Sequence, residues 1–148
     1  YMYMYFQVLL VVNVASECGY TDGHYRSLVN LQNQLEPDFT VLAFPCNQFG
    51  NQEPGTNKEI KDFAEKTYGV NFPMFSKINV INDNVPDFWT FLTDEAKAVP
   101  NWNFWKYLVD KKGKVVHAWG PWVSVESITP YITDLIKYGK VRGLTDEL

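Results

Sequence analysis

The segment from Val8 to Val14 is a short apolar run in which β-branched residues predominate. Such a run is typical of a strand that is buried on both faces, as in a parallel sheet. Phe39 to Phe44 is a second apolar, strand-like segment. Between them, residues 22–36 place most of their apolar side chains on one helical stripe, with Asp22 as a candidate N-cap and Pro37 after the end. Strand, helix and strand predict a parallel pair joined by a right-handed crossover.

Two further helices are expected in the middle of the chain. Thr56 and Glu59 have the spacing of a capping box, which indicates the start of a helix. Pro86 fits the first turn of a third helix. The apolar residues assigned to these helices are Ile60, Phe63 and Ala64 in the first, and Phe88, Trp89, Phe91 and Leu92 in the second.

The last third of the chain adds a hairpin and a helix. Phe104 to Val109 and Lys114 to Trp119 are strand-like and flank a polar turn, which predicts a β-hairpin. A last helix is expected from about Pro130 to Tyr138. We therefore predict an α/β protein with a thioredoxin-like fold. Its mixed central sheet would combine a parallel pair with an antiparallel hairpin, flanked by helices.

Length and composition favour one domain over residues 1–148, although residues 1–6 are given little weight. With 46% hydrophobic and 20% charged residues, the chain has the composition of a globular protein and not of a disordered one. The net charge of −4 makes nucleic acid an unexpected partner. No stretch of 18 apolar residues is present, so we expect no membrane span.

Cys18 lies where a reactive thiol would be expected. It follows the carboxyl end of the first predicted strand and precedes a helix, which is where open α/β sheets bind ligands. Backbone N–H groups at a helix start stabilise a thiolate, the nucleophilic form of cysteine. Cys46 closes the second strand, and adjacent parallel strands would bring it near Cys18. Whether Cys46 attacks an oxidised Cys18 or only packs in the core stays open at this point.

Three residues with neutral hydrogen-bond donors also lie next to the ends of predicted strands. Gln48 lies in the loop after the second strand, and Trp102 and Asn103 precede the hairpin. Amide and indole N–H groups can stabilise a thiolate without supplying an acid. Taken one at a time, each is better explained as a turn, surface or core residue.

Other chemistries find little support. The two cysteines are too few for a four-thiolate zinc site, and no phosphate-binding glycine loop or nucleophile elbow occurs. His24 and His117 are expected to be surface or packed residues and not metal ligands. We therefore expect no metal and no cofactor.

Three motifs resemble those of the glutathione peroxidase family, over about Val11 to Ile136. Asn13 to Thr21 is similar to the peroxidatic loop, with cysteine where many members carry selenocysteine. Leu42 to Pro54 is similar to the second signature, and Trp102-Asn103-Phe104 to the third. The resemblance implies a catalytic tetrad of Cys18, Gln48, Trp102 and Asn103.

The departures from the family indicate which members are most similar. The predicted helix with Phe63 and Ala64 lacks the resolving cysteine of thioredoxin-dependent members, and the short segment from Phe91 to Trp102 implies a monomer. The chain is most similar to the endoplasmic-reticulum types 7 and 8, which are thought to pass oxidation to protein disulfide isomerases. Ala118 and Trp119 stand where other members offer basic residues, which weakens glutathione as the obligatory reductant.

The resemblance implies a peroxidase in which Cys18 reduces hydrogen peroxide or an organic hydroperoxide and becomes a sulfenic acid. A disulfide-isomerase-type protein dithiol or glutathione would then reduce it. The alternative is a redox sensor with little turnover. A thioredoxin-like reductase is disfavoured because no Cys-x-x-Cys motif occurs, and a peroxiredoxin because Ala15 stands where that family needs threonine.

The two ends of the chain suggest a compartment. The abrupt start suggests that a leader was removed. Thr145 to Leu148 is one residue short of a retention signal for the endoplasmic reticulum. We therefore expect the lumen of that compartment or the secretory pathway.

Overall fold

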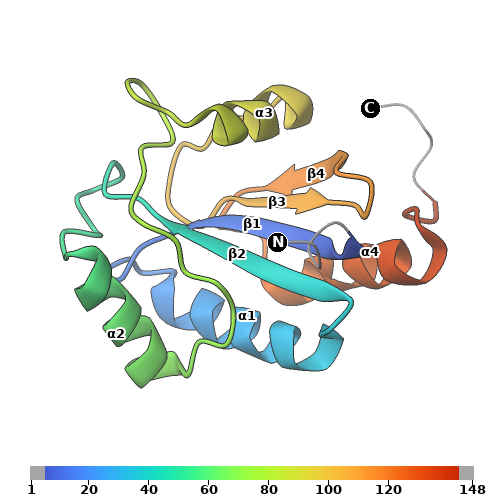
Figure 1. Ribbon diagram of the computed structural model, residues 1–148, viewed down its shortest axis with the longest axis horizontal. Helices are drawn as coiled ribbons and strands as arrows, with labels where there is room; N and C mark the ends of the chain where they lie inside the picture. The colour runs from blue at the N-terminus through green and yellow to red at the C-terminus, as the bar shows by residue number, and fades with distance from the viewer. Residues whose placement is uncertain (1–5, 144–148) are drawn as a thin grey trace.

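A four-stranded mixed sheet lies at the centre of the computed structural model, which describes residues 6–143. The strands are β1 (Val8–Val14), β2 (Phe39–Pro45), β3 (Lys106–Val109) and β4 (Val115–Trp119), in the spatial order β2-β1-β3-β4. β1 pairs in parallel with β2 and antiparallel with β3, and β3 and β4 form the hairpin. The predicted α/β class and mixed sheet are confirmed (Figure 1).

Helices cover both faces of this sheet. They are α1 (Thr21–Leu35), α2 (Asn57–Tyr68), α3 (Asp87–Ala96) and α4 (Val125–Tyr138). α1 and α4 lie on one face, α3 lies on the other, and α2 lies beside α1 (Figure 1). The order of strands and helices along the chain agrees with the prediction.

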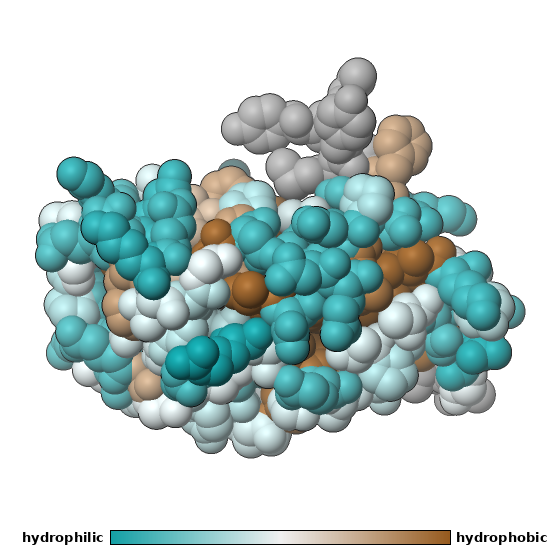
Figure 2. All heavy atoms as spheres, turned by 90° about the horizontal axis from the view of Figure 1, so that it is seen from below, coloured by the Kyte–Doolittle hydropathy of each residue, from teal (hydrophilic) through white to brown (hydrophobic). Residues whose placement is uncertain are grey.

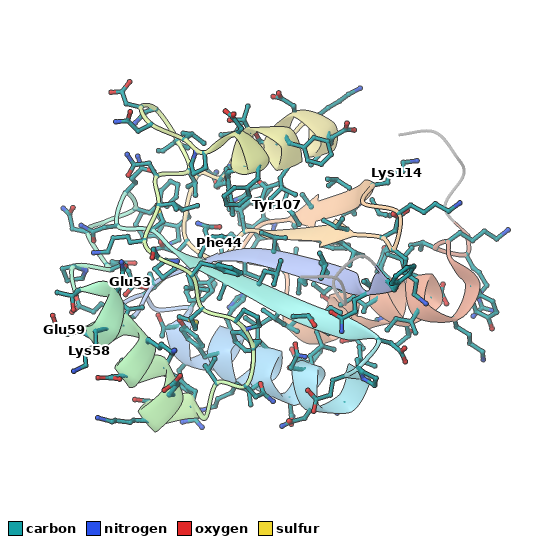
Figure 3. The ribbon with its side chains drawn as sticks, in the orientation of Figure 1. Phe44, Glu53, Lys58, Glu59, Tyr107 and Lys114 are labelled. Carbon is teal, nitrogen blue, oxygen red and sulfur yellow. The ribbon has the colours of Figure 1, made fainter. Side chains whose placement is uncertain are left out.

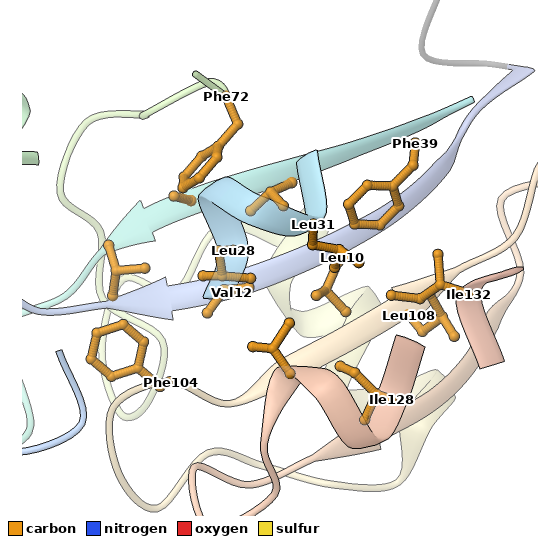
Figure 4. Packing of buried hydrophobic residues seen from close by; sticks show 14 of the residues in the cluster. Leu10, Val12, Leu28, Leu31, Phe39, Phe72, Phe104, Leu108, Ile128 and Ile132 are labelled. Carbon is orange, nitrogen blue, oxygen red and sulfur yellow. The ribbon is translucent and has the colours of Figure 1, made fainter. Parts of the chain in front are cut away.

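β1 contributes to the core on both of its faces, which is why its sequence is so apolar. Val12 packs toward α1 and α4, whereas Val11 packs toward α3. Figure 4 shows the first of these clusters, whose members include Leu10, Leu28, Leu31, Leu108, Ile128 and Ile132. Burial of apolar side chains on this scale contributes about 1.5–3 kcal/mol for each large residue.

α1 separates buried and exposed residues as its apolar stripe predicts. Tyr25, Leu28 and Leu31 are buried against the sheet. The view from below Figure 1 shows a surface covered mainly by hydrophilic side chains (Figure 2). The exposed residues of α1 are Asp22, Gly23, Arg26, Asn30, Asn33 and Gln34.

The start of α1 differs from the prediction. The N-cap position is Tyr20, which has no side-chain capping bond, and Asp22 lies inside the first turn. Asp22 instead forms an exposed ion pair with Arg26 at 3.0 Å. The helix begins earlier because Thr21 hydrogen-bonds both to the Cys18 N–H and to the Ala15 carbonyl, at 3.0 and 2.7 Å.

Two other boundaries differ for identifiable reasons. α4 begins at Val125 and not near Pro130, because Ser124 caps it and the buried Val125 and Ile128 hold its first turn on the core. Proline at that position removes one helical hydrogen bond, and packing overrides the loss. β3 begins at Lys106 and not at Phe104, whose positive φ of 63° is incompatible with an extended strand.

The other helix predictions are confirmed with small changes. The Thr56–Glu59 capping box is present. Of the apolar residues assigned to the two middle helices, Ile60, Ala64, Trp89 and Leu92 are buried, Phe63 is half-buried, and Phe88 and Phe91 are exposed. Within residues 6–143, none of the helices has the length and apolarity needed to cross a bilayer.

Candidate active site

Cys18 lies in the loop between β1 and α1, at the edge of the sheet where the carboxyl ends of β1 and β2 meet. Its side chain is half-buried and packs against the core beneath α1. The Cys18 sulfur accepts a hydrogen bond from the Tyr20 N–H at 3.5 Å. The loop thus directs one backbone donor at the Cys18 sulfur.

A second loop, after β2, holds the Cys18 loop in place. The Glu17 N–H donates to the Gln52 carbonyl at 3.0 Å. The carboxylate of Glu53 accepts from both the N–H and the hydroxyl of Ser16, at 3.0 and 2.5 Å. Figure 3 shows Glu53 between the carboxyl end of β2 and the start of α2. Residues 52 and 53 therefore fix the backbone immediately before Cys18.

The turn that carries Trp102 and Asn103 is held against the end of β1 by Asn13. This buried residue donates from its side chain to the Trp102 carbonyl at 3.1 Å and accepts from the Trp105 N–H at 3.0 Å. Its backbone carbonyl accepts from Phe104 at 2.7 Å. The three motifs singled out in the sequence are therefore adjacent in space.

Asn103 and Gln52 are bonded directly to each other. The buried Asn103 side chain donates to the Gln52 side-chain oxygen at 3.0 Å and to the Phe49 carbonyl at 3.3 Å. The Trp102 ring lies beside Gly50, where an added Cβ would come within 2.9 Å of it. Only glycine leaves room for the ring there, and φ at this residue is +69°.

Gln48 lies in the same loop, but its side chain bonds to a different segment, at Val80 and Ile81. Its side-chain oxygen accepts from the N–H groups of Val80 and Ile81, at 2.7 and 3.1 Å, and its amide donates to the Ile81 carbonyl at 2.8 Å. These bonds fix the segment around residue 80 and occupy both ends of the amide. The catalytic role predicted for Gln48 stays a prediction, and Gln52 is the glutamine that adjoins Asn103.

Gln52 was missed in the sequence because the loop offers two glutamines four residues apart. Nothing in residue type separates them, since both are neutral donors in the same loop. Their difference lies in which backbone groups the folded loop presents to each. One feature of the sequence does distinguish Gln52 from Gln48. Gln52 follows Gly50, and a glycine allows the backbone to turn sharply between the two glutamines.

Cys46 is completely buried, in the cluster that faces α3. Its thiol donates to the Gln48 side-chain oxygen at 3.4 Å, and burial raises its pKa. Cys18 packs against the opposite cluster, so the two thiols lie in different environments.

Glu53 is a completely buried carboxyl group with one of its two oxygens hydrogen-bonded to Ser16. Burial raises its pKa from about 4.5 to about 7, and the bonds from Ser16 oppose this shift. Between these two pH values the folded state binds more protons at this site than the unfolded state. The contribution of Glu53 to stability therefore decreases as the pH rises from 4.5 to 7.

We predict that Glu53→Gln removes this pH dependence. The melting temperature of the variant, relative to that of the parent, should rise between pH 4.5 and pH 7.5, as measured by circular dichroism. Glu59→Gln is the control because Glu59 is exposed and its pKa is lowered by Thr56. That control should show no such rise, and parallel curves for Glu53→Gln and the parent would contradict the prediction.

Comparison with known proteins places these features in a family. Residues 3–93 match the family described as glutathione peroxidase. The chain is 60% identical to glutathione peroxidase 7 of Bos taurus over 131 residues, which cover 88% of this chain and 70% of that protein. It is 48% identical to the probable glutathione peroxidase 8 of Homo sapiens, over 95% of this chain and 68% of that protein.

Solved structures agree with this result. The crystal structure of T. cruzi GPX1 superposes with a TM-score of 0.70 at 33% identity, over 93% of this chain and 85% of that one. A thioredoxin-like protein in its oxidised form, at 13% identity and a TM-score of 0.64, shares the fold. The predicted thioredoxin-like fold is thereby confirmed. From its motifs, its fold and these identities, the chain belongs to the glutathione peroxidase family.

Proposed function

We propose that this chain is a thiol peroxidase that reduces hydrogen peroxide or an organic hydroperoxide at Cys18. The observation that carries the proposal is the half-buried Cys18 sulfur with the Tyr20 N–H directed at it, at the carboxyl edge of the sheet. Membership of the glutathione peroxidase family supports the same chemistry.

In the first step the Cys18 thiolate attacks the terminal oxygen of the hydroperoxide. The S–O bond forms while the O–O bond breaks, so sulfur is oxidised to a sulfenic acid and the peroxide is reduced. The leaving oxygen takes up a proton and departs as water or alcohol. Donors near the sulfur assist by stabilising the charge that develops on the leaving oxygen.

Trp102, Asn103 and Gln52 are the side chains that we assign to this stabilisation. The support for Gln52 is its bond to Asn103 and the bond of its carbonyl to the Cys18 loop. Trp102 is half-buried beside Gly50 and has its indole N–H available as a neutral donor. Gln48 is the alternative glutamine, and a pair of variants distinguishes the two.

We predict that Cys18→Ser abolishes peroxide consumption and leaves the fold intact. A serine hydroxyl is hardly ionised at neutral pH, so it is a far poorer nucleophile than a thiolate. Stopped-flow peroxide decay measures the loss, and far-ultraviolet circular dichroism checks the fold. Cys46→Ser serves as the matched cysteine control and should still consume one equivalent of peroxide. Undiminished activity in Cys18→Ser would overturn the assignment.

We predict that Gln52→Ala slows single-turnover oxidation of Cys18 by roughly tenfold, because removal of one preorganised donor costs at most about 10²–10³ and several donors share the role here. Gln48→Ala should keep a rate near that of the parent but melt at a lower temperature, because it deprives the Val80 and Ile81 backbone of partners. The opposite result, with Gln48→Ala slow and Gln52→Ala normal, would restore Gln48 as the catalytic glutamine.

In the second half of the cycle the Cys18 sulfenic acid must be reduced by a thiol. We propose that a partner protein supplies this thiol. α2 has the half-buried Phe63 and the buried Ala64 where a resolving cysteine would stand in some relatives, and Cys46 is buried in the opposite cluster. The incoming thiol condenses with the sulfenic acid, water leaves, and a mixed disulfide forms. The second cysteine of a protein dithiol then resolves this disulfide at high effective concentration.

We predict that a disulfide-isomerase-type dithiol reduces oxidised Cys18 faster than glutathione does at equal thiol concentration, because glutathione needs a second bimolecular encounter. Coupled turnover with each reductant measures the two rates. Little change in Cys46→Ser with the isomerase indicates direct attack on Cys18, whereas a large loss indicates an internal disulfide. Faster turnover with glutathione would contradict the prediction.

The rival function is a redox sensor that is oxidised once and exchanges its disulfide with little turnover. Repeated peroxide consumption with added reductant distinguishes the peroxidase from the sensor. We also propose the secretory pathway as the compartment, from the resemblance to types 7 and 8, and a monomer as the working form, from the short segment between Phe91 and Trp102. The terminal Thr145 to Leu148, which suggested retention, lies outside the described residues.

A further inference from the structure

Lys106, the first residue of β3, is a completely buried amine. Its Nζ lies 2.8 Å from Nε2 of His24, 3.1 Å from the Phe104 carbonyl and 3.0 Å from the Gly120 carbonyl. An ammonium group has three protons to donate, and three neutral acceptors surround it. Burial lowers the pKa of Lys106 to about 7, and the charged form donates to all three partners at once. Within the part of the chain that the structure describes, none of the hydrogen-bond partners of Lys106 is a carboxylate, so burial of this charge is costly.

The His24 ring is the partner that leads from Lys106 toward Cys18. Its Nε2 accepts from Lys106, and its Nδ1 lies 3.1 Å from the Tyr20 carbonyl, which can only accept. These partners assign the proton to Nδ1 and require a neutral ring. Burial, with the Lys106 charge as a second cause, lowers the pKa of His24 to about 4, in agreement with a neutral ring. The ring also packs on Phe104, with centroids 4.9 Å apart.

Tyr20 connects this pair to the reacting sulfur. Its carbonyl is bonded to the His24 ring and also to the His24 N–H at 3.1 Å, and its own N–H donates to the Cys18 sulfur. The Tyr20 side chain is 40% exposed, so packing contributes less to holding this residue than it would in the core. The bond from the His24 ring adds to the helical bond at the Tyr20 carbonyl and to the bond from the Thr21 N–H to the Cys18 carbonyl at 3.1 Å in holding the Tyr20 backbone.

We propose that Lys106 and His24 are positioning residues for the reaction of Cys18, because the Lys106 ammonium holds the His24 ring, the ring helps to hold the Tyr20 carbonyl, and a fixed Tyr20 backbone keeps the Tyr20 N–H on the sulfur. The inference rests on the proposed peroxidase function. The same ammonium also holds the Phe104 carbonyl, at the end of the turn that carries Trp102 and Asn103. Lys106 thus connects the two segments that meet around the thiol.

The test uses Lys106→Met, which keeps the length of the side chain and removes its charge, and His24→Phe, which keeps a flat ring against Phe104 and removes both nitrogens. Each should slow single-turnover oxidation of Cys18 by roughly tenfold. One well-placed donor accelerates a reaction of this kind by about 10²–10³, and a misdirected N–H loses part of that acceleration. The double variant should be no slower than the slower single variant, because both act through one chain of contacts.

A spectroscopic measurement separates positioning from a general loss of stability. In the ¹⁵N–¹H spectrum the Tyr20 amide proton should move upfield in both variants, because its bond to sulfur weakens. Leu31→Ala, a buried truncation elsewhere in α1, is the control. It should lower the melting temperature while leaving the Tyr20 signal and the oxidation rate unchanged.

Three outcomes are decisive. Slower oxidation together with a moved Tyr20 signal supports the proposal. Folded variants that keep the rate of the parent, or a Tyr20 signal that stays in place, overturn it. If Lys106→Met does not fold, His24→Phe decides by the same two measurements. The proposed function fails on a different result, namely peroxide consumption by Cys18→Ser.

Discussion

The bonds between Asn13 and the turn at residues 102–105 hold the site together. β1 is central because it pairs with β2 on one side and β3 on the other, and Asn13 lies one residue before its end. A carboxamide is suited to this place because it donates to one backbone carbonyl and accepts from one backbone N–H at the same time. Both groups would otherwise be left without these partners, at a cost of about 1–3 kcal/mol each when buried. The apolar strand and the polar turn are thus joined by one side chain.

Several completely buried polar groups gather at this end of the sheet. Asn13, Glu53, Asn103 and Lys106 are all completely buried there. Glu53 bonds to the loop after β1, Asn103 to the loop after β2, and Asn13 to the turn before β3. Lys106 bonds to His24 in α1 and to the Phe104 and Gly120 carbonyls, so these side chains supply partners to irregular backbone. The second oxygen of Glu53 and the side-chain oxygen of Asn103 have no partner within the described residues. Within residues 6–143 the hydroxyl of Tyr25 and the indole N–H of Trp89, both in the core, also lack a partner, so incomplete hydrogen bonding is not confined to these two groups.

The environments of the two cysteines give them different chemistry. Cys18 is half-buried and receives a backbone N–H, which favours the charged nucleophile. Cys46 is buried among aromatic residues, where burial disfavours the charged form and raises its pKa. Nucleophilic attack needs a thiolate and access. Cys18 is accessible and its sulfur receives a backbone donor, whereas Cys46 is completely buried, which agrees with an external thiol as the partner in the second half of the reaction.

The sequence by itself determined the elements and their order, and the position of Cys18. Apolar runs specify buried strands, and the stripe in residues 22–36 specifies a helix, because periodicity reports burial directly. It did not determine that Gln52 and not Gln48 adjoins Asn103, that α4 continues through Pro130, or that Lys106 bonds to His24. Each of these depends on contacts between residues far apart in the chain. A polar side chain takes its role from the groups that the fold brings within 3 Å or so of it, and local sequence carries no information about that distance.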